Sequence, residues 1–108
     1  FVARTGTLYF NELVKLMKLA LAKNGFAAID IFTQCPTNYG RNNRLGKPID
    51  LIKTQASILV PKEKYDSLEQ SEKAGKFARG IIQDVEKPTF LDHYRACILS
   101  TRKAVHHE

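Results

Sequence analysis

The chain contains one short and strongly apolar run, which is followed at once by a polar segment. The run covers residues 26–32 and carries a single charged side chain, Asp30. A run of this length and composition is typical of a strand that is buried on both faces of a parallel sheet. Ligands of open α/β sheets bind just beyond the carboxyl ends of the strands, and Cys35 follows this run at such a place. Cys35 is therefore the first candidate for a functional residue.

Upstream of this run, the pattern predicts a strand and an amphipathic helix. Residues 1–4 suit the end of a strand, residues 5–7 interrupt it, and Thr7 or Asn11 can cap the helix that follows. Gly25 suits the end of that helix, because glycine adopts the left-handed conformation without steric cost. The order of strand, helix and apolar strand indicates a right-handed βαβ crossover. The apolar positions at helical spacing are Phe10, Leu13, Val14, Met17 and Leu21.

Downstream of the polar segment, the pattern predicts a short helix, a linker and a strand. Pro48 suits the first position of a helix that ends before Pro61. Residues 60–76 are polar and predict a linker or a loose helical segment. Residues 75–83 predict a strand in which Gly80 allows a bulge or a close backbone contact. The short helix has an expected apolar face of Ile49, Ile52, Ala56 and Leu59.

A final helix is predicted after Thr89, whose side chain can cap it. Cys97 lies on the apolar face of this helix, between Tyr94 and Ile98. We expect it to be a small buried hydrophobic residue, which is the commoner role of a free cysteine in a helix. The adjacent histidines that follow, His106 and His107, do not face one another on a helix, so no metal site is expected there.

Length and composition indicate a small domain without a membrane span. With 108 residues and 44% apolar side chains, the chain can build a modest core. No run approaches the roughly 18 consecutive apolar residues of a membrane-spanning helix, and no secretory signal is visible. The two cysteines do not form a disulfide pattern, which favours a reducing cytoplasm. The first residue is not a methionine, so we expect a piece of a longer chain.

The chain is basic, with 17 Lys and Arg residues against 11 Asp and Glu residues and a net charge of +6. Such an excess favours an acidic partner, which can be a nucleic acid, an anionic substrate or an acidic protein. The basic residues are scattered and are not interleaved with aromatic residues, as a single-strand binder would require. A basic nucleic-acid-binding module is therefore one alternative interpretation, and a structural α/β module with an idle thiol is another.

The segment around Cys35 reads GFAAIDIFTQCPTNYGRN, and its Cys-Pro-Thr part is the most specific. Together with residues 1–4 and 80–94, this segment resembles the beta subunit of the 2-oxoacid:ferredoxin oxidoreductases. The matching segments are spread over most of the chain, in order and with consistent spacing. The NYGR continuation is closer to the 2-oxoglutarate branch of the family than to the pyruvate branch.

The resemblance implies oxidative decarboxylation of a 2-oxoacid to an acyl-coenzyme A, with electron transfer to ferredoxin. The implied cofactors are thiamine diphosphate, magnesium and a four-iron four-sulfur cluster held by four cysteine thiolates. Cys35 matches the cluster ligand in the Cys-Pro motif, and the other three lie near the N-terminus of the family's beta subunits. The implied partners are the alpha subunit, gamma and delta subunits in some members, and ferredoxin. Arg41 and Arg44 are candidates for docking an acidic ferredoxin.

The chain departs from the family pattern in two respects. The other three cysteines are absent, and so is the Gly-Asp-Gly segment that holds magnesium and the diphosphate. We therefore expect the C-terminal part of a beta subunit, which contains no catalytic residue, binds none of these cofactors tightly by itself and is inactive alone. The expected fold is α/β, with residues 1–47 as the end of a thiamine diphosphate-binding parallel-sheet domain and residues 48–108 as a C-terminal extension.

Overall fold

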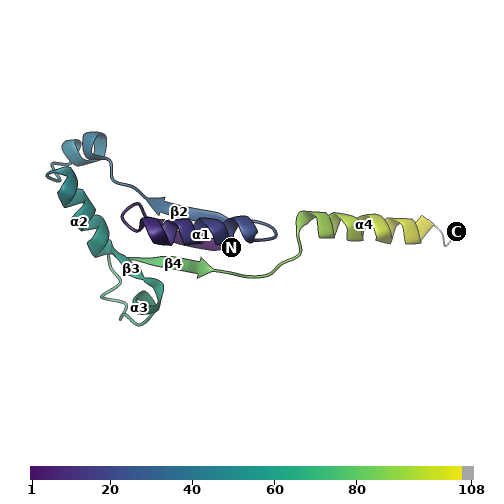
Figure 1. Ribbon diagram of the computed structural model, residues 1–108. Helices are drawn as coiled ribbons and strands as arrows, with labels where there is room; N and C mark the ends of the chain where they lie inside the picture. Colours follow the sequence, from purple (N-terminus) through teal and green to yellow (C-terminus); the bar gives the residue numbers. More distant parts are fainter. Residues whose placement is uncertain (106–108) are drawn as a thin grey trace.

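Within residues 1–105, the protein is an elongated structure of four strands, four helices and one π-helical turn. A computed structural model describes residues 1–105, so His106 and His107 lie outside the described range. The strands are β1 (Val2–Gly6), β2 (Ala28–Phe32), β3 (Leu59–Pro61) and β4 (Phe77–Gln83). The helices are α1 (Phe10–Ala22), α2 (Pro48–Ile58), α3 (Lys62–Asp66) and α4 (Phe90–Val105), and the turn is η1 (Pro36–Gly40). The molecule measures 74 × 33 × 25 Å along its principal axes, with α4 at one end (Figure 1).

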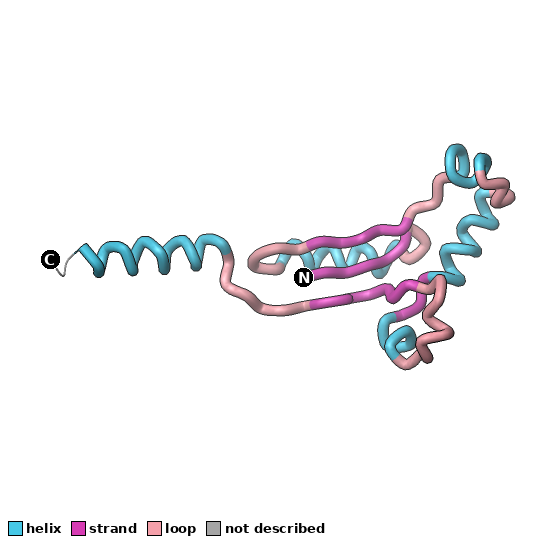
Figure 2. Tube along the Cα trace, turned by 180° about the vertical axis from the view of Figure 1, so that it is seen from behind, coloured by secondary structure: helices cyan, strands magenta, loops and turns pink. Residues whose placement is uncertain are grey.

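The strands form one mixed sheet in the order β2-β1-β4-β3. β1 and β2 are parallel, with Gly6 opposite Phe32, as the predicted crossover requires. β4 runs antiparallel to β1 and parallel to β3, and Figure 2 shows these strands side by side. The α/β class is confirmed, but the sheet is not wholly parallel, because the chain returns antiparallel beside β1. Gly80 has a φ of +112° near a register shift, in agreement with the expected irregularity.

The core lies between β1 and α1. Phe1, Ala3 and Leu16 form a buried cluster there, since β1 has a neighbouring strand on each side. β2 was expected to be buried on both faces, but it lies at the edge of the sheet and none of its residues is fully buried. The reason is that it pairs with β1 alone and contacts α1 on one face, so that Ile31 stays 39% exposed.

Helix α1 packs on the sheet through the edge of its expected apolar stripe, which Leu16 and Leu19 widen, and not through its centre. Leu16 is buried, whereas Phe10 and Leu21 of the expected face point away from the core. The helix is apolar around most of its circumference, so periodicity alone could not select the side that packs. Its N-cap is Tyr9, without a capping side-chain bond, so neither Thr7 nor Asn11 caps the helix as expected.

Helix α2 also turns an unexpected face inward. Leu51 and Gln55 are its buried residues, whereas Ile49 of the expected face is 52% exposed. Leu59 leaves the helix and begins strand β3, which the sequence did not predict because it has only three residues and ends in a proline. The following segment contains the short helix α3, in agreement with the expected loose helical excursion.

Helix α4 stands apart from the sheet, as the ribbon in Figure 1 shows. Its cap is the predicted one, because the Thr89 hydroxyl accepts a hydrogen bond from the Asp92 amide at 3.2 Å. The expected burial of Cys97 is wrong, since the thiol is exposed on a helix that stands apart from the sheet. Among the described residues, no helix has both the length and the apolar character that crossing a membrane requires.

Candidate functional site at Cys35

Cys35 lies at the carboxyl edge of the parallel strand pair, where the sequence places it. β1 and β2 end side by side, with Gly6 opposite Phe32, and Cys35 follows three residues later. Its backbone is extended, with φ −118° and ψ 93°, because a following proline disfavours the helical region. The thiol is free and exposed. The site therefore presents a reactive sulfur to solvent from a defined position on the sheet.

Backbone amides of η1 affect the titration of the Cys35 thiol. The amide N–H of Tyr39 has the largest effect on the thiol, followed by that of Asn38, and Thr37 adds a smaller contribution. These donors stabilise the negative charge of the thiolate and so lower the pKa of the Cys35 thiol below its ordinary value, against a smaller opposing effect of desolvation. The arrangement favours the thiolate, which is the form of cysteine that binds metals and attacks electrophiles.

The loop that carries the sulfur is closed by its own backbone. The Gly40 amide donates to the carbonyl oxygen of Cys35 at 2.8 Å, and the Leu45 amide donates to that of Gly40 at 2.9 Å. Gly40 is buried against α2, where a Cβ atom would lie 2.9 Å from Leu51 Cδ1. Only glycine fits this contact without displacing Leu51, so the turn sits directly on the helix.

A residue that the sequence analysis missed connects α2 to the carboxyl ends of both strands. Gln55 is 5% exposed, and its Nε2 donates to the carbonyl oxygen of Phe32 at 2.8 Å. Its Oε1 accepts a longer bond from the Leu8 amide, at 3.4 Å. No sequence signal identified this role, because a glutamine within a helix ordinarily faces solvent.

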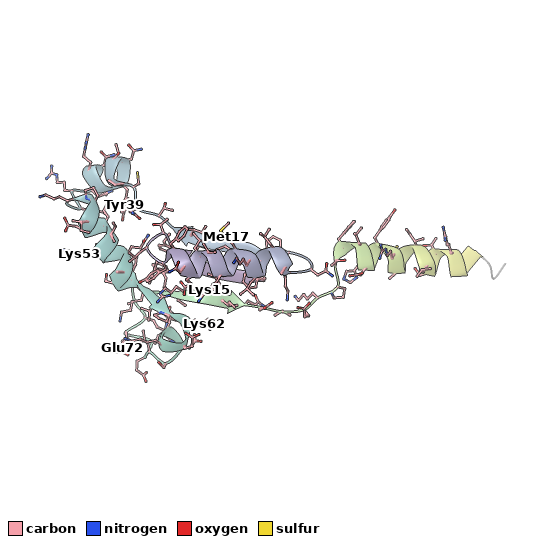
Figure 3. All side chains as sticks on the ribbon, in the orientation of Figure 1. Lys15, Met17, Tyr39, Lys53, Lys62 and Glu72 are labelled. Atoms are coloured by element: carbon pink, nitrogen blue, oxygen red, sulfur yellow. The ribbon has the colours of Figure 1, made fainter. Side chains whose placement is uncertain are left out.

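Arg41 and Arg44, the expected docking residues, belong to the same loop as Cys35. Both are exposed, and within residues 1–105 neither takes part in a salt bridge. Arg44 has a φ of +54°, which places it in a tight left-handed turn. Tyr39 protrudes from the same loop, at the end of the molecule far from α4 (Figure 3). The loop that carries Cys35 thus also carries two exposed positive charges.

The described residues supply one candidate metal ligand at this site. Within residues 1–105, no group of three or more His, Cys, Asp or Glu side chains is placed to hold a metal ion. The second cysteine, Cys97, belongs to α4 at the opposite end of the molecule (Figure 1). The structure therefore does not bring the two thiols together.

Comparison with known proteins relates the chain to one subunit of an enzyme. It is 37% identical over 98 residues to the 2-oxoglutarate synthase subunit KorB of Methanocaldococcus jannaschii, a match that covers 91% of this chain and 36% of that protein. It is 29% identical over 92 residues to the subunit of the same name from Methanothermobacter marburgensis, covering 85% of this chain and 32% of that protein. The chain thus spans about a third of the length of these relatives.

No protein-family profile and no solved structure matches the chain. A third relative, KorB of Methanothermobacter thermautotrophicus, is 30% identical over 82% of this chain and 31% of its own length. The resemblance read from the Cys-Pro-Thr segment is thereby confirmed as a homology to part of a 2-oxoacid oxidoreductase subunit, KorB. Over most of its length, the chain is a homologue of part of the 2-oxoglutarate synthase subunit KorB.

Proposed function

We propose that this chain is part of the beta subunit of a 2-oxoglutarate:ferredoxin oxidoreductase and that Cys35 supplies one thiolate to its iron–sulfur cluster. The observation that carries the proposal is the position of the sulfur. It is exposed beyond the carboxyl end of β2 and faces the backbone amides of η1. The homology to KorB supports the enzyme to which we assign this site.

The residues around Cys35 fit one corner of a four-iron four-sulfur cluster. Such clusters are held by thiolates, and hydrogen bonds to the sulfur tune their reduction potential. The Tyr39 and Asn38 amides stabilise the thiolate form, and Gly40 packs closely against Leu51 in the turn that carries these amides. When bound, the cluster would supply one-electron transfer toward ferredoxin. The other three thiolates, magnesium and thiamine diphosphate belong to other parts of the enzyme in this proposal.

The proposal is tested by replacing each cysteine in the complete enzyme that contains this chain. Cys35→Ser should lower the iron content and change the low-temperature EPR spectrum of the reduced enzyme, because a hydroxyl is a poorer ligand than a thiolate for this iron. Cys97→Ser is the matched control, and it should leave both readouts unchanged, since Cys97 is exposed on α4. A full cluster in Cys35→Ser, or its loss in Cys97→Ser, would refute the assignment.

We further propose that Arg41 and Arg44 steer ferredoxin toward this end of the subunit. Both are exposed and unpaired among the described residues, in the loop that carries Cys35. Steering by exposed charges acts on association rates and weakens with salt. Replacing both arginines by glutamine should raise the apparent KM for ferredoxin several-fold at low ionic strength and less at high ionic strength. The control is Lys53→Gln on α2, and an unchanged salt dependence in the arginine variant would exclude the role.

The remaining assignments complete this proposal. The substrates are 2-oxoglutarate and coenzyme A, the partners are the other subunits and ferredoxin, and the compartment is the cytoplasm. Residues 1–47 would belong to the thiamine diphosphate-binding domain and residues 48–108 to an extension. Because the chain spans about a third of its relatives, we expect the isolated chain to show no 2-oxoglutarate-dependent reduction of a viologen dye. Measurable turnover by these residues alone would contradict the proposal.

A further inference from the structure

A basic pocket lies outside the Cys35 loop. It has a volume of about 320 Å³ and is formed by the end of α2, strand β3, helix α3, the start of β4 and Tyr9. This volume is at the lower end of the range of small-molecule sites, roughly 300–1,000 Å³. Its walls include the apolar side chains of Leu59, Val60 and Leu68. The pocket can therefore take a small organic molecule.

Three cationic side chains line this pocket, and no carboxylate does. They are Lys64 from α3, Lys76 just before β4, and Arg79 within β4. Within residues 1–105, neither lysine takes part in a salt bridge. By contrast, the nearby Lys62 pairs with Asp66 at 2.5 Å. The two lysines thus place unneutralised positive charge at one pocket.

The guanidinium of Arg79 is held in place by protein groups. Its Nη1 donates to Glu12 Oε1 at 2.5 Å, and its Cζ lies 3.9 Å from the centre of the Tyr9 ring. The other oxygen of Glu12 accepts a bond from the buried hydroxyl of Thr5 at 2.7 Å, so this carboxylate is fully engaged on the side of β1. Arg79 Nε is buried without a partner. Arg79 is therefore held in a fixed orientation in the wall of the pocket.

We infer that this pocket binds a small phosphomonoester through its phosphate dianion. Glu12 offsets the charge of Arg79, which leaves the two lysines and a local charge of +2. A phosphate dianion neutralises this charge, whereas a carboxylate or a phosphodiester neutralises only half of it. The apolar walls suit the organic part of the ligand. This site uses none of the residues assigned to the cluster.

The test measures binding of inorganic phosphate to the complete protein that contains this chain, by calorimetry at constant ionic strength. The variant Lys64→Gln/Lys76→Gln should weaken the affinity at least tenfold. The matched control, Lys15→Gln/Lys53→Gln, removes the same charge from the outer faces of α1 and α2 and should change the affinity less than twofold (Figure 3). Acetate, a monoanion, should bind at least tenfold more weakly than phosphate.

Binding of a short single-stranded oligonucleotide distinguishes a phosphate pocket from a nucleic-acid-binding surface. If the phosphate pocket is the site, any oligonucleotide binding should be displaced by phosphate and should fall in Lys64→Gln/Lys76→Gln. No detectable phosphate binding, equal loss in the control variant, or oligonucleotide binding that phosphate does not displace would each overturn the inference. Amide chemical shifts recorded on adding phosphate should change at Lys76 and Arg79 and not at Cys35.

Discussion

Gln55 and Phe32 are joined by a hydrogen bond of 2.8 Å, in which Gln55 Nε2 donates to the main-chain carbonyl oxygen of Phe32. The same carbonyl oxygen also accepts from the Thr7 amide at 3.0 Å. Phe32 ends β2 and Thr7 directly follows β1, so one acceptor joins the two parallel strands and α2. Cys35 follows this junction by three residues and directly precedes η1. Gln55 therefore ties α2 to the point of the sheet from which the loop departs.

Gln55→Met should destabilise the protein, because methionine keeps the volume of the side chain but removes both hydrogen bonds. The loss leaves the Leu8 amide without its side-chain partner and costs about 1–3 kcal/mol of unfolding free energy. Urea denaturation of the wild type and the variant measures this loss of unfolding free energy. Lys53→Met on the exposed face of the same helix is the control, and it should stay within about 0.5 kcal/mol. Equal effects of the two substitutions would show that the bonds contribute nothing.

Gly46→Ala should cost more stability than Gly75→Ala, although both glycines have a positive φ, +85° and +70°. A Cβ atom at Gly46 would lie 2.7 Å from Asp50 Oδ2, whereas at Gly75 it would meet nothing within 4 Å. Asp50 accepts the Lys47 amide at 2.8 Å at the start of α2, so the clash also disturbs this cap. The two variants should differ in unfolding free energy by about 0.5–2 kcal/mol, which is the usual contribution of a helix cap. Thermal or urea unfolding measures this difference. A difference of zero would mean that Asp50 moves aside without cost.

The sequence predicted the parts of the site that follow from local chemistry. The apolar run ends where β2 ends, Pro36 holds Cys35 extended, and Thr89 caps α4. Each of these outcomes depends on residues that are adjacent or three positions apart, so no knowledge of the tertiary fold was needed.

The features that the sequence did not reveal depend on which surfaces meet. Leu16 and Gln55 are buried because the sheet and α2 approach from particular directions, which an evenly apolar helix or a polar side chain does not indicate. The direction of β4 depends on the long excursion through β3 and α3, and its antiparallel pairing with β1 has no local signal. Cys97 is exposed for the converse reason, because α4 stands apart from the sheet and nothing among the described residues covers the thiol.

The thiol of Cys35 should react with iodoacetamide at a lower pH in the folded chain than in urea. The amides of Tyr39 and Asn38 lower the pKa of this thiol, and the thiolate is the reactive form. By linkage, the folded thiolate contributes stability above the unfolded pKa of cysteine, and this stability is lost as pH falls through the lowered pKa. Alkylation rates against pH, in a Cys97→Ala background, measure the shift. The same midpoint in buffer and in urea would exclude the amide effect.

The helix content of α4 should fall on acidification, because its first turn depends on an ionised carboxylate. The Thr89 amide and hydroxyl donate to Asp92 Oδ2 at 2.8 and 2.7 Å, and these bonds lower the pKa of Asp92. The stabilisation is complete above the unfolded pKa of aspartate, about 3.9, and is lost as pH falls through the lowered folded pKa. An isolated helix of 16 residues is only marginally stable, so the change should be visible in the 13Cα shifts of residues 90–102. Asp92→Asn should abolish this acid dependence, and its persistence in that variant would refute the prediction.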